Sequence, residues 1–170
     1  MQRILRHEAM EYEFNHNHEP KLKVKQGEKF VIETEDAGSG MIRTPEIASE
    51  WRSLPTKQFE PSKGNPVGGP VYIEGAKRGD LLEISIEEII VDDQGYTGYL
   101  DGAGPLGDSY RWKSIRGPFI HIIKHIPGPS GTMKDGKGIL NKNVSWDLQP
   151  MIGTIGVAPD REVETTSVGQ

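Results

Sequence analysis

The sequence predicts an all-β fold, either a sandwich or a barrel, with long Gly/Pro-rich loops and little helix. Short segments alternate apolar and polar residues, as around Leu82, Ile84 and Ile86, with the period of two that is typical of a half-buried strand. The 21 glycines and 12 prolines among 170 residues separate these segments by turns. No linker or internal repeat divides the sequence, so we expect a single domain over residues 1–170.

The N-terminal segments are expected to be short strands. Residues 11–16 alternate Glu or Asn with ring-bearing side chains, which predicts an opening strand that ends before Pro20. Residues 22–24 and 30–34 predict two further strands. The turn residues at 26–27 favour a hairpin-like connection between them.

An acidic strand end leads into a glycine-rich loop over residues 33–40, Glu-Thr-Glu-Asp-Ala-Gly-Ser-Gly. Carboxylates at a strand end can project into a site, and small residues allow other groups to approach closely. Residues 41–62 follow with no clear period. We expect one short amphipathic helix there, within a long excursion between strands.

The centre of the chain, residues 63–86, combines a rigid loop with strand patterns. Two prolines restrict the backbone of the loop, and two glycines extend its conformational range. The pattern then predicts a short strand over 71–73, a turn over 77–80 and a half-buried strand over 82–86 that residues 89–91 extend.

The C-terminal part is expected to alternate loops and strands. Residues 96–108 are rich in glycine and predict a loop. Residues 119–126 predict a strand that carries His121 and His125 on one face. A turn-rich connector over 127–138 and a short strand over 146–148 follow.

Composition excludes several classes of protein. The net charge of −5, with acids and bases interspersed, offers no basic stripe for nucleic acid. The apolar runs are too short to span a bilayer, so we expect no membrane association. The absence of cysteine excludes disulfides, thiolate metal sites and a cysteine nucleophile. With no signal peptide pattern after Met1, a cytoplasmic location is expected.

Asp36 and Asn65 are the candidate catalytic residues. Asp36 follows an acidic strand end, where a carboxylate can bind a divalent metal or orient a water molecule. The alternative is an aspartate that only hydrogen-bonds the backbone of its own turn. Asn65 lies between Gly64 and Pro66, where its amide can bind a substrate carbonyl or the main chain. Its alternative role is to hold the loop together.

Other candidates carry weaker signals. Gly68 and Gly69 fit an architectural role, since they give the loop conformations that are closed to other residues. His16 and His18 are two residues apart, a spacing that metal sites on strands use, but a segment such as Asn-His-Asn-His-Glu is more often a polar loop. His121 and His125 are too far apart on a strand to share one ion, and we expect both to be structural.

Three segments resemble the acetamidase/formamidase family. Residues 65–82, Asn-Pro-Val-Gly-Gly-Pro-Val-Tyr-Ile-Glu-Gly-Ala-Lys-Arg-Gly-Asp-Leu-Leu, are similar to the family signature "NPvtGPiyVeGAepGDvL". Residues 24–37 resemble its "V-x-x-GD-x-V-x-x-ET-x-DA" segment, and residues 150–159 resemble "PfiGtiGvAP". The three segments lie in the family's order, and the resemblance covers nearly the whole chain.

The resemblance implies a jelly-roll-like β-sandwich of two sheets and a hydrolase that converts small amides such as formamide and acetamide to the carboxylate and ammonia. By this resemblance Asp36 is expected to bind a divalent metal, zinc or calcium, or to orient water. Asn65 would contact the substrate, and Gly68 and Gly69 would line the substrate site.

The resemblance also implies a missing part. The family continues after "GvAP" into "GGN-x-D" and "HA-x-x-GDGE" segments, whereas here Pro159 is followed by eleven further residues. We therefore expect the chain to correspond to the N-terminal half and to need a C-terminal half, a second chain or self-association. The alternative function is a non-catalytic β-sandwich that serves as a scaffold or binding subunit.

Overall fold

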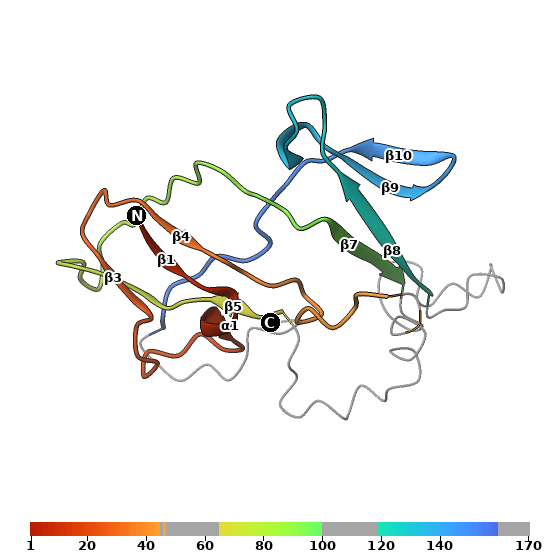
Figure 1. Cartoon of the computed structure of the whole chain (residues 1–170). Helices are drawn as coiled ribbons and strands as arrows, with labels where there is room; N and C mark the ends of the chain where they lie inside the picture. The colour runs from red at the N-terminus through yellow and green to blue at the C-terminus, as the bar shows by residue number, and fades with distance from the viewer. Residues whose placement is uncertain (45, 47–64, 100–118, 160–170) are drawn as a thin grey trace. The chain divides into compact units, whose positions relative to one another are not determined.

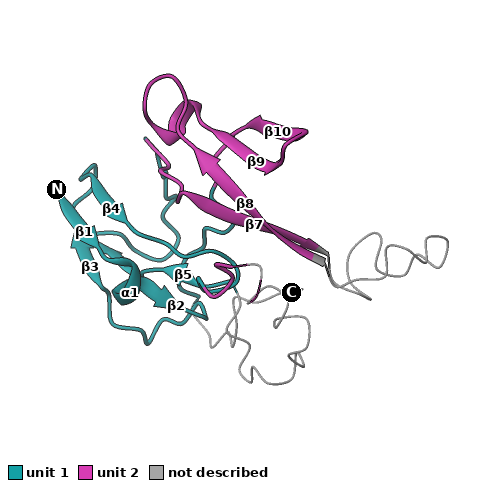
Figure 2. Ribbon diagram, turned by 45° about the vertical axis from the view of Figure 1, so that its right-hand side comes forward, with its two compact units in different colours: residues 1–40, 59–87, 152–170 teal, residues 41–58, 88–151 magenta. Residues whose placement is uncertain are grey.

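The computed structural model describes residues 1–44, 46, 65–99 and 119–159. These residues form two compact units, shown in Figure 2. Unit 1 contains residues 1–40, 65–87 and 152–159, and unit 2 contains residues 41–44, 46, 88–99 and 119–151. Each unit has its own strands and its own buried side chains.

Unit 1 is built from short strands that pair in twos (Figure 1). Two of these pairs are parallel and join residues that are far apart in the sequence, with Gln2 opposite Phe30 and Leu22 opposite Val71. The third pair is antiparallel. The elements are β1 (Gln2–Ile4), α1 (Arg6–Ala9), β2 (Met10–Glu11), β3 (Leu22–Val24), β4 (Phe30–Ile32), β5 (Val67–Gly68) and β6 (Val71–Ile73), paired β1 with β4, β3 with β6 and β2 with β5.

The core of unit 1 lies between these ladders and α1. Ile4, Ala9 and Val24 are almost fully buried, with exposed fractions of 2%, 1% and 3%. The single turn of α1 begins after Leu5, whose backbone N–H donates to the Glu8 carboxylate at 3.2 Å. This short helix presents Ala9 to the core.

Unit 2 contains a four-stranded antiparallel sheet in the order β10-β9-β8-β7. Its longest strand, β8, pairs with β7 on one side and with β9 on the other. Ile120 packs against Ile42 with Tyr96 and Ile122 around them, and Ile123 is also buried. The elements are β7 (Gln94–Tyr99), β8 (Phe119–Ile126), a 3-10 helix (Met133–Asp135), β9 (Lys137–Asn141) and β10 (Val144–Asp147).

The predicted fold class is confirmed: the described chain is all-β, with long connections and little helix. The strands predicted over 22–24, 71–73 and 119–126 are present with the predicted bounds. Of the short strand predicted over 146–148, residues 146–147 form the end of β10, and Leu148 lies beyond it. Each of these segments contains β-branched or aromatic residues, which favour strands.

Three predicted strands or connections near the N-terminus and the centre are wrong. The opening strand ends at Glu11, because residues 15–18 form a turn in which the Asn15 side chain accepts from the Asn17 N–H at 2.8 Å. Strands β3 and β4 do not form a hairpin, since each pairs with a more distant strand. Residues 82–86 form no ladder with other described residues, and their apolar side chains are exposed.

The predicted loop over 96–108 is also wrong in its first part. Residues 94–99 form β7, because β8 provides an antiparallel partner along its whole length. Residues 100–108 lie outside the described residues. Of the helix expected within 41–62, residues 41–44 are not helical, Glu46 is helical, and the other residues lie outside the described part of the chain.

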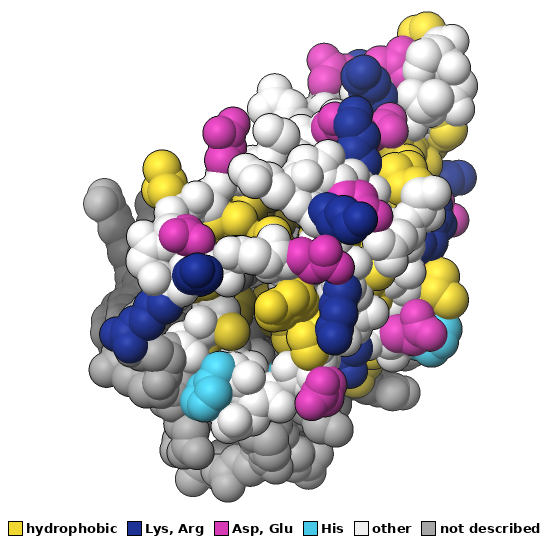
Figure 3. All heavy atoms as spheres, turned by 90° about the vertical axis from the view of Figure 1, so that its left-hand side faces the viewer, with side chains coloured by type: hydrophobic (Ala, Val, Ile, Leu, Met, Phe, Trp, Pro, Cys, Tyr) yellow, Lys and Arg dark blue, Asp and Glu magenta, His cyan; other side chains and the backbone are white. Residues whose placement is uncertain are grey.

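Acidic and basic side chains are interspersed on the surface. On the face drawn in Figure 3, both signs of charge lie among hydrophobic side chains within the coloured part. This distribution matches the modest net charge of −5. In the part of the chain that is described, no helix is long and apolar enough to cross a bilayer.

Candidate functional site

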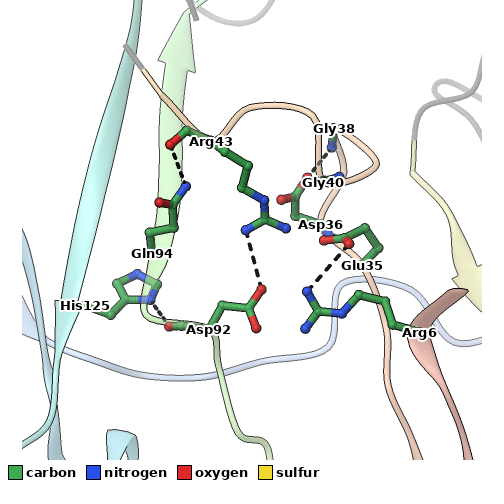
Figure 4. A network of polar contacts seen from close by, with 9 residues as sticks. All are labelled: Arg6, Glu35, Asp36, Gly38, Gly40, Arg43, Asp92, Gln94 and His125. Atoms are coloured by element: carbon green, nitrogen blue, oxygen red, sulfur yellow. Dashed lines mark hydrogen bonds and ion pairs between the residues drawn. The ribbon is translucent and has the colours of Figure 1, made fainter. Parts of the chain in front are cut away.

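Asp36 closes a tight turn after β4. Its Oδ1 accepts hydrogen bonds from the backbone N–H groups of Gly38 at 2.8 Å and of Gly40 at 3.2 Å (Figure 4). The Asp36 carbonyl also accepts from the Ser39 N–H at 2.9 Å. This geometry matches the expected alternative for Asp36, an aspartate that holds its own turn. It also fixes the position of the carboxylate, which a group acting on a substrate requires.

Glu35 is the more deeply buried carboxylate of this segment. Only 9% of its side chain is exposed, and its Oε2 lies 3.6 Å from the guanidinium of Arg6. The Glu35 Oε1 accepts from the Asp36 N–H at 3.0 Å. Arg6 comes from α1, so an ion pair joins the helix to the loop that carries Asp36 (Figure 4). Sequence reasoning did not find Arg6, because no motif links positions that far apart.

Glu33 anchors the other end of the acidic segment. Its carboxylate accepts from the backbone N–H of Arg6 at 3.2 Å and from the Arg3 guanidinium at 2.8 Å. The Arg6 N–H, followed by the Arg3 side chain, holds the pKa of the Glu33 carboxyl below its usual value. Both contacts connect the end of β4 with β1 and α1.

Asn65 lies beside the Asp36 turn. Its backbone N–H donates to the Ala37 carbonyl at 2.9 Å, so the residue next to Asp36 holds the loop that carries Asn65. Asn65 adopts a φ of 53°, a left-handed conformation that asparagine tolerates better than most residues. The structure therefore brings the two predicted catalytic residues, Asp36 and Asn65, into one part of unit 1.

Gly68 and Gly69 follow on the same loop, at the β2–β5 pair. Gly68 pairs with Met10, and the Gly69 N–H donates to the Ala9 carbonyl at 3.1 Å. A Cβ atom on Gly68 would lie 2.6 Å from Cγ2 of Ile32, so a side chain does not fit there. The Gly69–Pro70 peptide bond is cis. Gly69 has a φ of 139°, which other residues rarely adopt. Both glycines therefore have architectural reasons to be glycine, and their role in substrate binding stays a prediction.

A metal ion was also predicted at Asp36. Among the described residues, no group of three or more His, Asp or Glu side chains lies close enough to hold one. Glu35 and Asp36 supply carboxylates, but Glu35 faces Arg6 and Asp36 faces backbone N–H groups. The described side chains alone therefore do not make a complete set of metal ligands.

His18, which belongs to a segment expected to be a polar loop, lies between two carboxylates. Its Nε2 is 2.9 Å from Glu13 Oε1, and its Nδ1 is 3.5 Å from Glu11 Oε2. Lys21 approaches Glu11 as well, at 3.1 Å. This mixture of charges matches the polar-loop alternative for the segment that contains His16 and His18.

Unit 2 has a polar cluster of its own, which the sequence did not reveal. Arg43 and Asp92 form an ion pair at 3.5 Å, and the Gln94 side chain donates to the Arg43 carbonyl at 3.1 Å (Figure 4). His125 Nδ1 lies 2.7 Å from the Asp92 carbonyl. Because a carbonyl only accepts, Nδ1 must donate the proton, and in the neutral ring Nε2 keeps the lone pair.

The family of this protein follows from its sequence. The sequence profile of the Acetamidase/Formamidase family matches residues 4–168, which is nearly the whole chain. The family match thus agrees with the all-β fold and with the acidic and amide side chains on its loops. The chain belongs to the acetamidase/formamidase family.

Two solved structures are similar to this chain. The acetamidase from Bacillus halodurans is 31% identical, with a TM-score of 0.76, and the match covers 94% of this chain and 47% of that one. A predicted acetamidase/formamidase from Thermoanaerobacter tengcongensis is 29% identical, with a TM-score of 0.75, and the match covers 95% and 47%. This chain therefore spans about half the length of either protein. Among curated proteins, no match was found.

Proposed function

We propose that this chain forms part of an amide hydrolase that converts small linear amides, such as formamide or acetamide, to the carboxylate and ammonia. The observation that carries the proposal is the family match over residues 4–168. The similarity to an acetamidase from Bacillus halodurans supports it.

Amide hydrolysis needs a polarised carbonyl, an activated water and a proton for the leaving nitrogen. We assign Asp36 to orient the water, because its turn fixes the carboxylate through two backbone N–H groups. We assign the Asn65 side-chain amide to the substrate carbonyl, since the Ala37 carbonyl holds its backbone beside the Asp36 turn. Gly68 and Gly69 would line the site that binds a small substrate.

A divalent metal, zinc or calcium, would supply Lewis-acid chemistry if one binds. The described residues do not provide three ligands for it. Asp36 is the side chain of this chain that would contribute one ligand. No step of the reaction is assigned to the metal, and the roles of Asp36 and Asn65 stand without it.

We further propose that activity requires residues beyond these 170, supplied by a longer polypeptide, a second chain or an oligomer. The proposed location of the enzyme is the cytoplasm. The structures matched are about twice as long as this chain. The same observation favours a second candidate function, a non-catalytic scaffold or binding subunit. This alternative agrees with the Asp36 carboxylate acting on its own turn.

The test measures ammonia released from formamide and acetamide. The 170-residue chain is assayed alone and after co-expression with the part of the Bacillus halodurans acetamidase that it does not match, with zinc, with calcium and with chelator. We expect release from the co-expressed pair and little from the chain alone. Ammonia release from neither preparation, with both correctly folded, would support the scaffold.

The variant Asp36→Asn separates chemistry from architecture. Asparagine keeps the Oδ1 acceptor for Gly38 and Gly40 but removes the charge, so the turn should persist while the rate falls by about 100-fold, the scale expected for a lost acid–base group. The control is Asp80→Asn, which changes an aspartate that likewise accepts from a turn N–H, that of Lys77 at 2.8 Å. A rate for Asp36→Asn equal to that of the control would remove Asp36 from the mechanism.

A further inference from the structure

Residues 81–88 have the sequence of a strand, but among the described residues no strand pairs with them. Leu82, Ile84 and Ile86 share one face by their spacing, and their exposed fractions are 41%, 53% and 50%. The residues between them are exposed as well, and none of residues 81–88 joins a ladder within the described chain. A half-buried strand pattern without a partner indicates a surface that another strand covers.

This segment is held in place at both ends. Before it, the Lys77 N–H donates to the Asp80 carboxylate at 2.8 Å, and the Asp80 N–H donates to the Lys77 carbonyl at 3.0 Å. After it, Glu87 forms an ion pair with Lys29 at 2.6 Å. These contacts lie within unit 1. Residues 81–86 are therefore a span between fixed points rather than a loose end.

A second segment of unit 1 repeats the pattern. Residues 153–158 also join no ladder within the described chain, and Ile155 and Val157 are exposed by 55% and 67%. Between them, Gly156 fits against the ring of Phe14, because a Cβ on Gly156 would lie 2.8 Å from that ring. Gly156 therefore lies close to Phe14 of unit 1, whereas the side chains of Ile155 and Val157 are exposed to solvent.

We propose that residues 81–88 and 153–158 are docking strands for the part of the acetamidase/formamidase fold that this chain lacks. That part would add strands along both segments and cover Leu82, Ile84, Ile86, Ile155 and Val157. The inference rests on family membership and on the proposed need for further residues, and it adds where those residues bind.

The length of the matched structures identifies this occupant. Both contain the fold of this chain with TM-scores of 0.76 and 0.75, and in both the match accounts for only 47% of the chain. In each of these two proteins, the part that does not match is about as large as the part that does, and both parts belong to the same chain. A second copy of this chain is the competing occupant, and the experiment distinguishes the two.

The experiment measures binding and amide hydrogen exchange, not catalysis, so its outcome is independent of the proposed reaction. The probe is the part of the Bacillus halodurans acetamidase that this chain does not match, co-expressed with the tagged 170-residue chain. We expect a one-to-one complex in which the amides of residues 81–88 and 153–158 exchange at least tenfold more slowly than in the chain alone.

Matched variants test the docking face. Ile84→Lys places a charge on the apolar face, whereas Ser85→Lys places the same charge on the opposite face of the same segment. Both side chains are exposed, so both variants should fold, which circular dichroism checks. We expect Ile84→Lys to weaken the complex at least tenfold and Ser85→Lys to change it by less than threefold.

Several outcomes overturn the inference. Equal affinities of the two variants would place the contact elsewhere, and unchanged exchange in the complex would do the same. Slow exchange in a monomeric chain alone would mean that the segments are already paired. A dimer of the chain alone that Ile84→Lys dissociates would make a second copy the occupant. Failure of the two parts to associate would leave the segments without the proposed partner.

Discussion

The residues around Asp36 show how much of a candidate site depends on the main chain. Asp36 accepts from two backbone N–H groups, and Asn65 is held by a backbone carbonyl. The Glu33 carboxylate likewise accepts a hydrogen bond from a backbone N–H group, that of Arg6. The N–H of Arg6 and the Arg3 side chain lower the pKa of Glu33, which connects this carboxylate to stability in acid.

Glu33→Gln should reduce the pH dependence of stability. Because the pKa of Glu33 is lower in the folded state, its contribution is fully present above the unfolded value of about 4.3. That contribution is lost as the pH falls through the folded pKa. We expect the variant to unfold at lower urea concentration than the parent at pH 7 and at the same concentration at pH 2. The measurement is the urea midpoint at several pH values.

The control for this prediction is Glu83→Gln, which neutralises an exposed glutamate of the same unit. Its urea midpoint should follow that of the parent at every pH. A Glu33→Gln profile that runs parallel to the parent, with a constant difference, would mean that the charge of Glu33 does not contribute through its contacts with Arg3 and Arg6.

At this scale the sequence predicted part of the site. The family resemblance selected Asp36 and Asn65, and the structure brings their loops together through Ala37. Arg6 was not predicted, because its contact with Glu35 spans residues far apart in the chain. Arg43 and Asp92 were missed for the same reason. The two adjacent aspartates at 92–93, just before β7, were the only local sign of the polar cluster in unit 2.

Among the elements, the β2–β5 pair has the least room for change. Gly68→Ala would place a Cβ 2.6 Å from Ile32 Cγ2 and 3.1 Å from Thr34 Cγ2. Either β4 or β5 must then shift, and overpacking of this kind costs about 1–3 kcal/mol. We expect the free energy of unfolding, measured in urea, to fall by that amount.

Gly153→Ala is the matched control for Gly68→Ala. A Cβ at Gly153 would meet nothing within 4 Å. We expect a change of less than about 0.5 kcal/mol, as for most surface substitutions. A similar loss of stability in both variants would show that the effect comes from the backbone freedom of glycine and not from the contact with Ile32.

The elements also show which parts of a fold local sequence can predict. The alternation at 119–126 predicted β8 with its bounds, and turn residues predicted the bends around 77–80. The pairing of β1 with β4 and of β3 with β6 was not predictable, because a parallel pair joins distant segments and leaves no local pattern. Residues 96–99 of β7 were mistaken for part of a loop, since the segment is rich in glycine and Gly95 and Gly98 lie within the strand.

For the molecule as a whole, exposed apolar side chains say more about possible interaction sites than the distribution of charge does. The net charge is modest, and the surface in Figure 3 mixes both signs. By contrast, Leu82, Ile84, Ile155 and Val157 leave aliphatic surface in contact with water. Exposed aliphatic side chains of this kind are candidates for an interaction site.

The apolar surface should be detectable in solution. We expect the folded chain to bind a hydrophobic fluorescent dye such as anilinonaphthalene sulfonate, because the dye partitions onto exposed aliphatic groups. The double variant Ile84→Ser with Ile86→Ser should bind less dye, whereas Ser85→Thr should leave binding unchanged. Dye fluorescence that is the same in all three proteins would contradict this expectation.

The way in which the two units divide the chain has a consequence for the order of events during folding. The four strands of unit 2 all lie within residues 94–147, and β8 and β9 are joined by a short connection. Unit 1 instead needs residues 1–40, 65–87 and 152–159 together. Contacts between near neighbours form faster than contacts between distant ones, because less chain entropy is lost in closing the loop.

Pulse-labelled hydrogen exchange should therefore show protection of β8 and β9 before protection of β1 and β3. Simultaneous protection of all four strands would indicate a single cooperative step. On a ribosome the difference becomes one of timing, since synthesis proceeds from the N-terminus. The first forty residues leave the ribosome early, yet they wait for more than a hundred later residues before unit 1 can close. Strand β1 can pair early with β4, whereas β3 stays unpaired until β6 (Val71–Ile73) has been synthesised. During that interval β3 is an open edge that other molecules able to bind nascent chains can cover.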